Sequence, residues 1–133
     1  MPKLVQGVTT LEVQDIKCSE AFYREKLGFR PGLFFGEPPT FCIISKDNVA
    51  IFLDLVRTSR AKPLNQYWAI YLYVDDVNGM AAELSARGVV LDREPEDQPY
   101  GCRDFDIRDP DGHVIGIGQN ELSAEGRLTL PYE

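Results

Sequence analysis

Apolar and polar residues alternate in two segments of the chain, and these two segments match each other. Residues 8–16 and 69–77 align at one constant offset. Alternation at every second residue is typical of a strand with one buried face. A match of this kind predicts two copies of one structural unit. The matched residues are Leu11, Val13, Asp15 and Ile16 in the first copy and Leu72, Val74, Asp76 and Val77 in the second.

Each of these predicted strands leads into a predicted helix. Asp15 and Asp76 stand at the helix starts, where a carboxylate accepts hydrogen bonds from the unpaired amides of the first turn. The second helix has apolar residues at the spacing of one helical face, and Gly88 follows where a left-handed cap residue is favoured. The first helix is less regular and is expected to end before Gly28. The apolar face of the second helix consists of Val77, Met80, Ala81 and Leu84.

Further strands are expected after each helix. In the first half they are Gly32–Phe35, Phe41–Ser45 and Val49–Val56, and in the second half Val89–Leu91, Arg103–Arg108 and Val114–Gln119. The segment Asp109-Pro110-Asp111-Gly112 is a strong turn signal between the last two. The order β-α-β-β-β, present twice, predicts an α+β fold built from tandem βαβββ modules.

The length of 133 residues fits one well-buried globular domain better than two. We expect a single domain over residues 1–133. Within it, the pattern predicts a first half at about 5–56, a polar linker at 57–66, a second half at about 67–121 and a C-terminal arm at 122–133.

Composition excludes several classes of partner. The formal net charge of −7 disfavours nucleic acids and anionic membrane surfaces, which bind clustered Lys and Arg. We find no apolar stretch long enough for a signal peptide or a membrane span, so a cytoplasmic protein is expected.

Cys18, Cys42 and Cys102 form no CxxC pair, and we expect reduced thiols. Arg103 beside Cys102 would favour a thiolate, although an unreactive thiol is the ordinary outcome.

Short motifs on the repeat resemble those of the glyoxalase, bleomycin-resistance and dioxygenase superfamily, also called the vicinal oxygen chelate superfamily. The resemblance covers about residues 5–121, and Gln98-Pro99-Tyr100-Gly101 is most similar to bleomycin-resistance-type binding proteins. It implies cup-shaped mixed sheets, a homodimer and a small-molecule ligand. The motifs are Ala21-Phe22-Tyr23 with Leu27-Gly28-Phe29, then Tyr73-Val74-Asp75-Asp76, then Asp109-Pro110-Asp111-Gly112.

Strand alternation predicts which side chains face a ligand. The apolar residues of the matched strands are expected to pack on the helices, so the intervening residues face the other way. To these residues we add Phe34 from a neighbouring strand, and Tyr100 and Arg103 from the loop that resembles bleomycin-resistance proteins. The expected ligand-binding residues are Glu12, Phe34, Phe52, Asp54, Tyr71, Tyr73, Tyr100 and Arg103. Aromatic rings with two carboxylates suit a flat aromatic ligand, and a cation if the ligand is charged. Alternatively, these rings only fill the sheet face or a dimer interface.

The resemblance also implies where metal-dependent members hold a divalent ion. The corresponding residues here are Val8, Phe52, Ala69 and Gly116, and none has a side chain with the nitrogen or oxygen donors that such an ion requires. The only histidine, His113, follows the Asp109–Gly112 turn, where a solvent-facing side chain is the ordinary outcome. We therefore expect no metal and no cofactor.

These observations lead to two hypotheses of different classes. The first is a metal-independent binding protein that sequesters an aromatic, antibiotic-like molecule such as bleomycin. The second is a metal-free enzyme of the lyase or isomerase type, with Glu12 or Asp54 as the base. A third alternative is a member that keeps the fold without either role. The sequence leaves the identity of the ligand open.

Overall fold

The computed structural model describes residues 1–57 and 67–132. The chain forms two compact units, residues 1–61 and 62–133. The division falls inside the predicted linker at 57–66, of which residues 58–66 lie outside the described residues.

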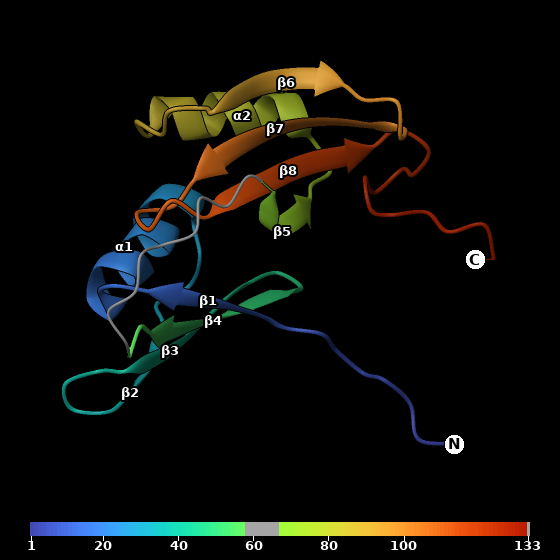
Figure 1. The fold of residues 1–133 in the computed structure, drawn as a ribbon. Helices are drawn as coiled ribbons and strands as arrows, with labels where there is room; N and C mark the ends of the chain where they lie inside the picture. Colours follow the sequence, from blue (N-terminus) through green and yellow to red (C-terminus); the bar gives the residue numbers. More distant parts are fainter. Residues whose placement is uncertain (58–66, 133) are drawn as a thin grey trace. The chain divides into compact units, whose positions relative to one another are not determined.

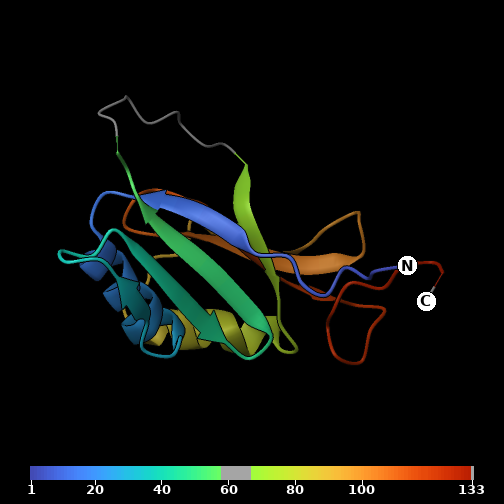
Figure 2. The ribbon, with the colours of Figure 1, turned by 90° about the horizontal axis from the view of Figure 1, so that it is seen from below.

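The first unit consists of β1 (Thr9–Val13), α1 (Ile16–Leu27), β2 (Leu33–Phe35), β3 (Phe41–Lys46) and β4 (Val49–Leu55). Its sheet has the strand order β1-β4-β3-β2, with β1 parallel to β4 and the other neighbours antiparallel. Helix α1 packs against β3 and β4 (Figure 2). Asp15 caps this helix by accepting from the Cys18 amide at 3.0 Å, and Gly28 ends it with φ 77°.

The second unit repeats this arrangement with β5 (Trp68–Tyr73), α2 (Val77–Ala86), β6 (Arg93–Asp97), β7 (Cys102–Arg108) and β8 (Val114–Asn120). The strand order is β5-β8-β7-β6, and again only the first pair is parallel (Figure 1). Asp76 accepts from the Gly79 amide at 3.0 Å, and Gly88 has φ 85°. Tandem βαβββ modules and both predicted caps are confirmed.

One predicted strand, Val89–Leu91, is wrong, and the strand of this region is β6. The Val89 amide donates to the Leu84 carbonyl at 3.0 Å, so this backbone completes the end of α2. Contact with β7 begins at Asp92, whose amide donates to the Asp106 carbonyl at 2.8 Å. β6 lies at the sheet edge, its register shifts around Pro95, and its polar sequence lacks the apolar alternation of a half-buried strand.

Each unit buries most of the apolar face predicted from alternation, although Leu72 and Val74 of that face are only half-buried. In β1, Leu11 and Val13 are buried and the intervening Glu12 is exposed. In the second unit, Ile115 and Ile117 of β8 are buried, as are Val77 and Leu84 of α2. Burial of such side chains stabilises by about 1.5–3 kcal/mol each, so these faces fix the strand registers on which the site depends.

The predicted C-terminal arm at 122–133 begins by folding back on its own unit. The Asn120 amide donates to the Gly126 carbonyl at 2.8 Å. Gly126 has φ 75°, and a Cβ atom there would overlap the Val74 carbonyl, so this close approach requires glycine. Beyond it, Leu128 and Tyr132 are exposed.

Candidate functional site

The candidate site lies on the face of the second sheet that is turned away from α2. Arg103 of β7 donates to Asn78 in α2 at 2.9 Å, and Gln119 of β8 accepts from the Val77 amide at 3.0 Å. Because side chains alternate along a strand, the even-numbered residues of β7 and β8 face the other side. These residues are Asp104, Asp106, Gly116 and Gly118, with Asp104 opposite Gly118 and Asp106 opposite Gly116.

Two glycines of β8 leave the space in which aromatic rings lie. A Cβ atom at Gly116 would come within 2.6 Å of the Trp68 indole nitrogen, and one at Gly118 would overlap the Tyr71 hydroxyl. Strict alternation places Trp68 on the same side as Leu72. The register shift between Trp68 and Ile70 changes this and brings the indole next to Tyr71.

Four rings form what we call the aromatic surface: Trp68, Tyr71, Tyr73 and Tyr100. The ring centroids of Trp68 and Tyr71 are 4.6 Å apart, those of Tyr71 and Tyr73 are 5.1 Å apart, and those of Trp68 and Tyr100 are 6.3 Å apart. All three pairs meet edge to face, which is a favourable aromatic geometry. Trp68 is 42% exposed, Tyr73 37% and Tyr100 53%, so the aromatic surface retains open ring area.

Asp104 holds two of these rings in place. Its fully buried carboxylate accepts from the Tyr71 hydroxyl at 2.8 Å and from the Tyr100 hydroxyl at 2.5 Å, both on Oδ2. Burial and the hydrogen bond to Asp104 raise the pKa of Tyr71 and of Tyr100 above the ordinary tyrosine value. Both phenols therefore stay protonated and remain donors to the carboxylate.

Arg93 of β6 pairs with both aspartates beneath the rings. Its guanidinium donates to Asp104 Oδ1 at 2.6 Å and to both Asp106 oxygens at 3.2 Å, while the Trp68 indole N–H donates to Asp106 at 2.9 Å. Burial lowers the pKa of Arg93, but its hydrogen bonds to Asp106 and Asp104 outweigh this and raise it above the ordinary value. Removing one partner of such an ion pair is costly, because the other charge stays buried.

The structure brings together three of the residues expected in this unit, Tyr71, Tyr73 and Tyr100. Arg103 lies apart from them, on the α2 side, where it pairs with Asp97 at 3.3 Å. Sequence reasoning missed Trp68, Arg93, Asp104 and Asp106. The sequence did contain a pattern that predicts the two aspartates. Asp-x-Asp on one strand and Gly-x-Gly on the next place two carboxylates beside space that has no side chain of its own. The polar strand β6 gave no signal for Arg93.

The other expected residues belong to the first unit. Phe52 and Phe41 have ring centroids 5.2 Å apart, and Glu12 lies in register with Asp54, whose carboxylate pairs with Arg57 at 3.6 Å. The structure corrects the expected position of Phe34. It lies in register with buried Cys42, which faces the side opposite to Phe52, and the neighbouring Phe35 contacts Phe41 instead. A change of one residue in register exchanges the two faces of a strand.

The residues at the family's metal positions do not fit a divalent ion. Val8 precedes β1, Phe52 lies in β4, and Ala69 lies in the irregular part of β5, and none has a donor side chain. At Gly116, the space for any longer side chain is taken by Trp68 and Tyr71. Within residues 1–57 and 67–132, no group of three or more His, Cys, Asp or Glu is arranged to hold a metal.

Cys102 lies at the start of β7 and is buried. Burial raises the pKa of this thiol, the interaction with the Tyr71 hydroxyl opposes part of that increase, and the nearby Asp104 and Glu121 carboxylates add to it. The adjacent Arg103 turns its guanidinium towards Asn78 and Asp97. The environment of Cys102 therefore favours the neutral thiol rather than a thiolate.

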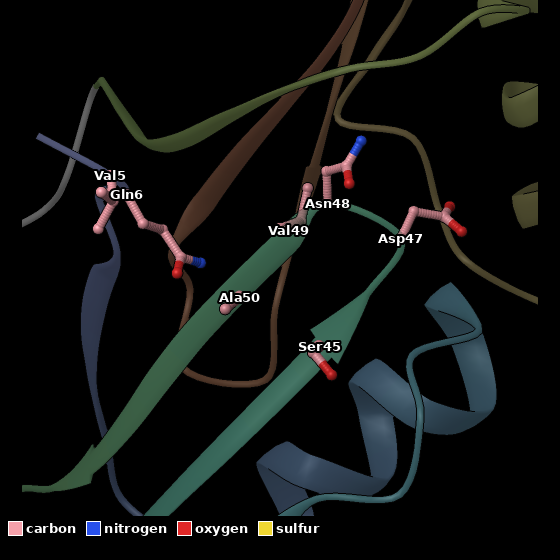
Figure 3. Close-up of a pocket in the computed structure, with 7 residues that line it drawn as sticks. All are labelled: Val5, Gln6, Ser45, Asp47, Asn48, Val49 and Ala50. Atoms are coloured by element: carbon pink, nitrogen blue, oxygen red, sulfur yellow. The ribbon is translucent and has the colours of Figure 1, made fainter.

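A separate pocket lies in the first unit, with a volume of about 440 Å³ (Figure 3). It is formed by the N-terminal segment and the hairpin between β3 and β4, and none of the expected ligand-binding residues lines it. The lining residues are Val5, Gln6, Ser45, Asp47, Asn48, Val49 and Ala50.

The chain belongs to the Glyoxalase/Bleomycin resistance protein/Dioxygenase superfamily, whose family model matches residues 6–117. Proteins of this superfamily bind small molecules. A comparison with curated proteins gives no match.

Solved structures share the fold at low identity. A bleomycin resistance determinant encoded on the transposon Tn5 is 23% identical, with a TM-score of 0.72 over 90% of this chain and 100% of that chain. Lactoylglutathione lyase from Agrobacterium tumefaciens is 22% identical, with a TM-score of 0.70 over 92% and 98%. A virulence protein from Salmonella typhimurium is 24% identical, with a TM-score of 0.66 over 90% and 98%. No helix in the described part of the chain is long and apolar enough to cross a membrane.

Proposed function

We propose that this protein sequesters an aromatic, antibiotic-like small molecule on the aromatic surface, without using a metal. The observation that carries the proposal is the cluster of partly exposed rings fixed around the buried Asp104 carboxylate. Trp68 gives this surface an indole, which offers a larger stacking area than the tyrosines expected from sequence.

The rigidity of the rings supports binding. Tyr71 and Tyr100 are held by hydrogen bonds to Asp104, and Trp68 by its bond to Asp106. A ligand that stacks on rings already in place loses less free energy to ordering of side chains, which is about 0.5–1.5 kcal/mol for each side chain immobilised. The superfamily assignment adds support, because its members bind small molecules.

The test uses the only tryptophan of the chain, Trp68, as a reporter at the site itself. Metal-free bleomycin is the first probe, because a bleomycin resistance determinant shares this fold. We expect quenching of Trp68 fluorescence and a rise in melting temperature, since a ligand that binds only the folded state stabilises it. Calorimetry with metal-free and copper-loaded bleomycin provides the affinity, where a micromolar constant corresponds to about −8 kcal/mol.

A matched pair of variants ties the signal to the site. Tyr100→Ala removes an exposed ring of the aromatic surface, and Tyr132→Ala removes an exposed ring in the C-terminal segment. We expect only the first to weaken binding. Absence of quenching, heat and thermal shift at about 100 µM bleomycin would contradict sequestration of this compound, because affinity would be weaker than micromolar.

A metal-free enzyme is the second candidate, favoured by the position of Glu12 directly beside Asp54 in register on neighbouring strands. Two adjacent carboxylates are a suitable arrangement for a general base and its partner. Mass spectrometry of the bound compound after long incubation separates the candidates. Sequestration returns the compound unchanged, whereas an enzyme returns a product that Glu12→Gln no longer forms.

A further inference from the structure

Arg93 has no N–H left for a ligand. A guanidinium has five N–H donors. Nε donates to Asp106, Nη1 donates to the Glu96 carboxylate at 3.2 Å and to the Asp104 carbonyl at 3.1 Å, and Nη2 donates to both aspartate side chains. The only cation beneath the aromatic surface is therefore saturated by the protein's own oxygens, among the residues that the structure describes.

The other donors of the aromatic surface are also used, with one exception. The Trp68 N–H and the hydroxyls of Tyr71 and Tyr100 all donate to the two aspartates. The exception is Tyr73, whose hydroxyl makes no hydrogen bond in the described part of the chain. The aromatic surface therefore offers a ligand one free donor, and this donor is uncharged.

Acceptors remain available on the same face. Each phenol oxygen that donates its proton keeps lone pairs, and donation to an ionised carboxylate makes that oxygen a stronger acceptor. The Tyr100 oxygen belongs to a half-exposed residue, and the Glu96 side chain is 59% exposed. The charges of Asp104, Asp106 and Glu96 outnumber that of Arg93, so the face is also negative.

On this face, free hydrogen-bond acceptors outnumber free donors. We therefore infer that the ligand of the aromatic surface is a planar aromatic compound that brings its own N–H donors, such as an aryl amidine, and that aryl carboxylates are rejected. The inference rests on the proposed function and adds the hydrogen-bonding class of its ligand. A carboxylate on these rings would lose its hydration and gain at most one neutral donor, the Tyr73 hydroxyl, and it would lie next to fixed negative charge. An amidinium would place its N–H groups against the phenol oxygen of Tyr100 and the carboxylate of Glu96.

The test compares three probes with the same bicyclic ring. Naphthalene-2-carboxamidine carries a cation with N–H donors, 2-naphthyltrimethylammonium carries a cation without them, and naphthalene-2-carboxylate carries an anion. Binding is measured by quenching of Trp68 fluorescence and by calorimetry. We expect the amidine to bind at least about tenfold more tightly than either of the others, which corresponds to about 1.4 kcal/mol.

Two variants that each lose one negative charge show where the preference for the amidine over the carboxylate arises. Asp106→Asn replaces a carboxylate under the rings with an amide that has donors of its own, and Asp97→Asn makes the same change where the side chain pairs with Arg103 on the α2 side. We expect the ratio of amidine to carboxylate affinity to fall only in the first. Because Asp106→Asn disturbs a buried network, Glu96→Gln serves as a second variant at an exposed position, and it should also lower the ratio.

The possible outcomes separate this inference from the proposed function. Equal affinity for the amidine and the quaternary ammonium would overturn it, because charge alone would then select the ligand. Equal or tighter binding of the carboxylate would also overturn it, while binding of aromatic compounds would stand. If none of the three probes quenched Trp68, the proposed function itself would fail, and the inference with it.

Discussion

The Tyr71 hydroxyl lies directly over Gly118 and donates to the Asp104 carboxylate at 2.8 Å, and a Cβ atom at Gly118 would overlap that hydroxyl. Asp104 and Gly118 are partners in register on β7 and β8. The smallest residue on one strand therefore makes room for the ring that satisfies a buried charge on the next strand. This relationship shapes the aromatic surface and leads to the first prediction.

Gly118→Ala should displace Tyr71 and remove its hydrogen bond to Asp104. Inserting a methyl group into occupied space costs about 1–3 kcal/mol, and a lost partner of a buried charge adds to it. Urea denaturation measures the free energy of unfolding. Gly7→Ala is the control, because no atom beyond the adjacent residues lies within 4 Å of a Cβ atom there. Equal stability of the two variants would contradict the close approach of Tyr71 to Gly118.

The free energy of unfolding should fall at alkaline pH, because the two phenols bonded to Asp104 lose their protons less readily in the folded protein than in the unfolded one. The pKa of Tyr71 and of Tyr100 is raised in the folded state, first by burial and then by the hydrogen bond to Asp104. Above about pH 10 the unfolded tyrosines lose protons while the folded ones keep them, so unfolding becomes more favourable as pH rises. This contribution to stability is complete below about pH 10.

The measurement is the melting temperature between neutral pH and strongly alkaline pH. Tyr71→Phe should reduce the slope of stability against pH, and Tyr132→Phe, at an exposed residue, serves as the control. The same slope in Tyr71→Phe and in the unmodified protein would contradict the assignment of this effect to Tyr71.

The three cysteines should differ in reactivity. Burial, together with the Glu20 carboxylate, raises the pKa of Cys42 to about 11, and burial also raises the pKa of Cys102, whereas Cys18 is exposed. Because the thiolate is the reactive form, iodoacetamide at neutral pH should label Cys18 first in the folded protein. Peptide mass spectrometry identifies the site. Cys18→Ser should abolish the fast labelling, and rapid labelling of Cys102 would contradict this order.

The purified protein should contain no stoichiometric divalent metal. The residues at the family's metal positions, Val8, Phe52, Ala69 and Gly116, offer no donor side chains. Elemental analysis after mild dialysis should find far less than one ion per chain. One equivalent of zinc, nickel, manganese or iron would overturn this prediction.

The protein should form a two-fold dimer in solution. The edge strand β2 exposes Leu33, Phe34 and Phe35, and an apolar edge of this kind favours pairing with another chain. Light scattering at micromolar concentration should give about twice the chain mass of 15.0 kDa. Phe35→Lys should shift the equilibrium towards the monomer, and a wild-type protein with the mass of one chain would contradict the prediction.

The order of the helices and strands and the positions of the helix caps could be predicted from the sequence alone. Asp15 and Asp76 at the helix starts, the alternation around Leu11 and Leu72, and the turn at Asp109–Gly112 each depend on residues within a few positions of one another. Such short-range patterns were sufficient for the tandem βαβββ order and its two caps. They were not sufficient for β6, because an edge strand with a proline carries no apolar alternation.

The candidate site was decided by the tertiary structure. Trp68 joins the aromatic surface through a shift in strand register, and Phe34 leaves the expected face through the register of β2 with β3. Arg93 reaches Asp104 only because β6 pairs with β7, and the ring of Tyr71 meets that carboxylate only because β5 and β7 both flank β8. Strand register and strand order are set by long-range burial and hydrogen bonding, and a local pattern of residues does not contain this information.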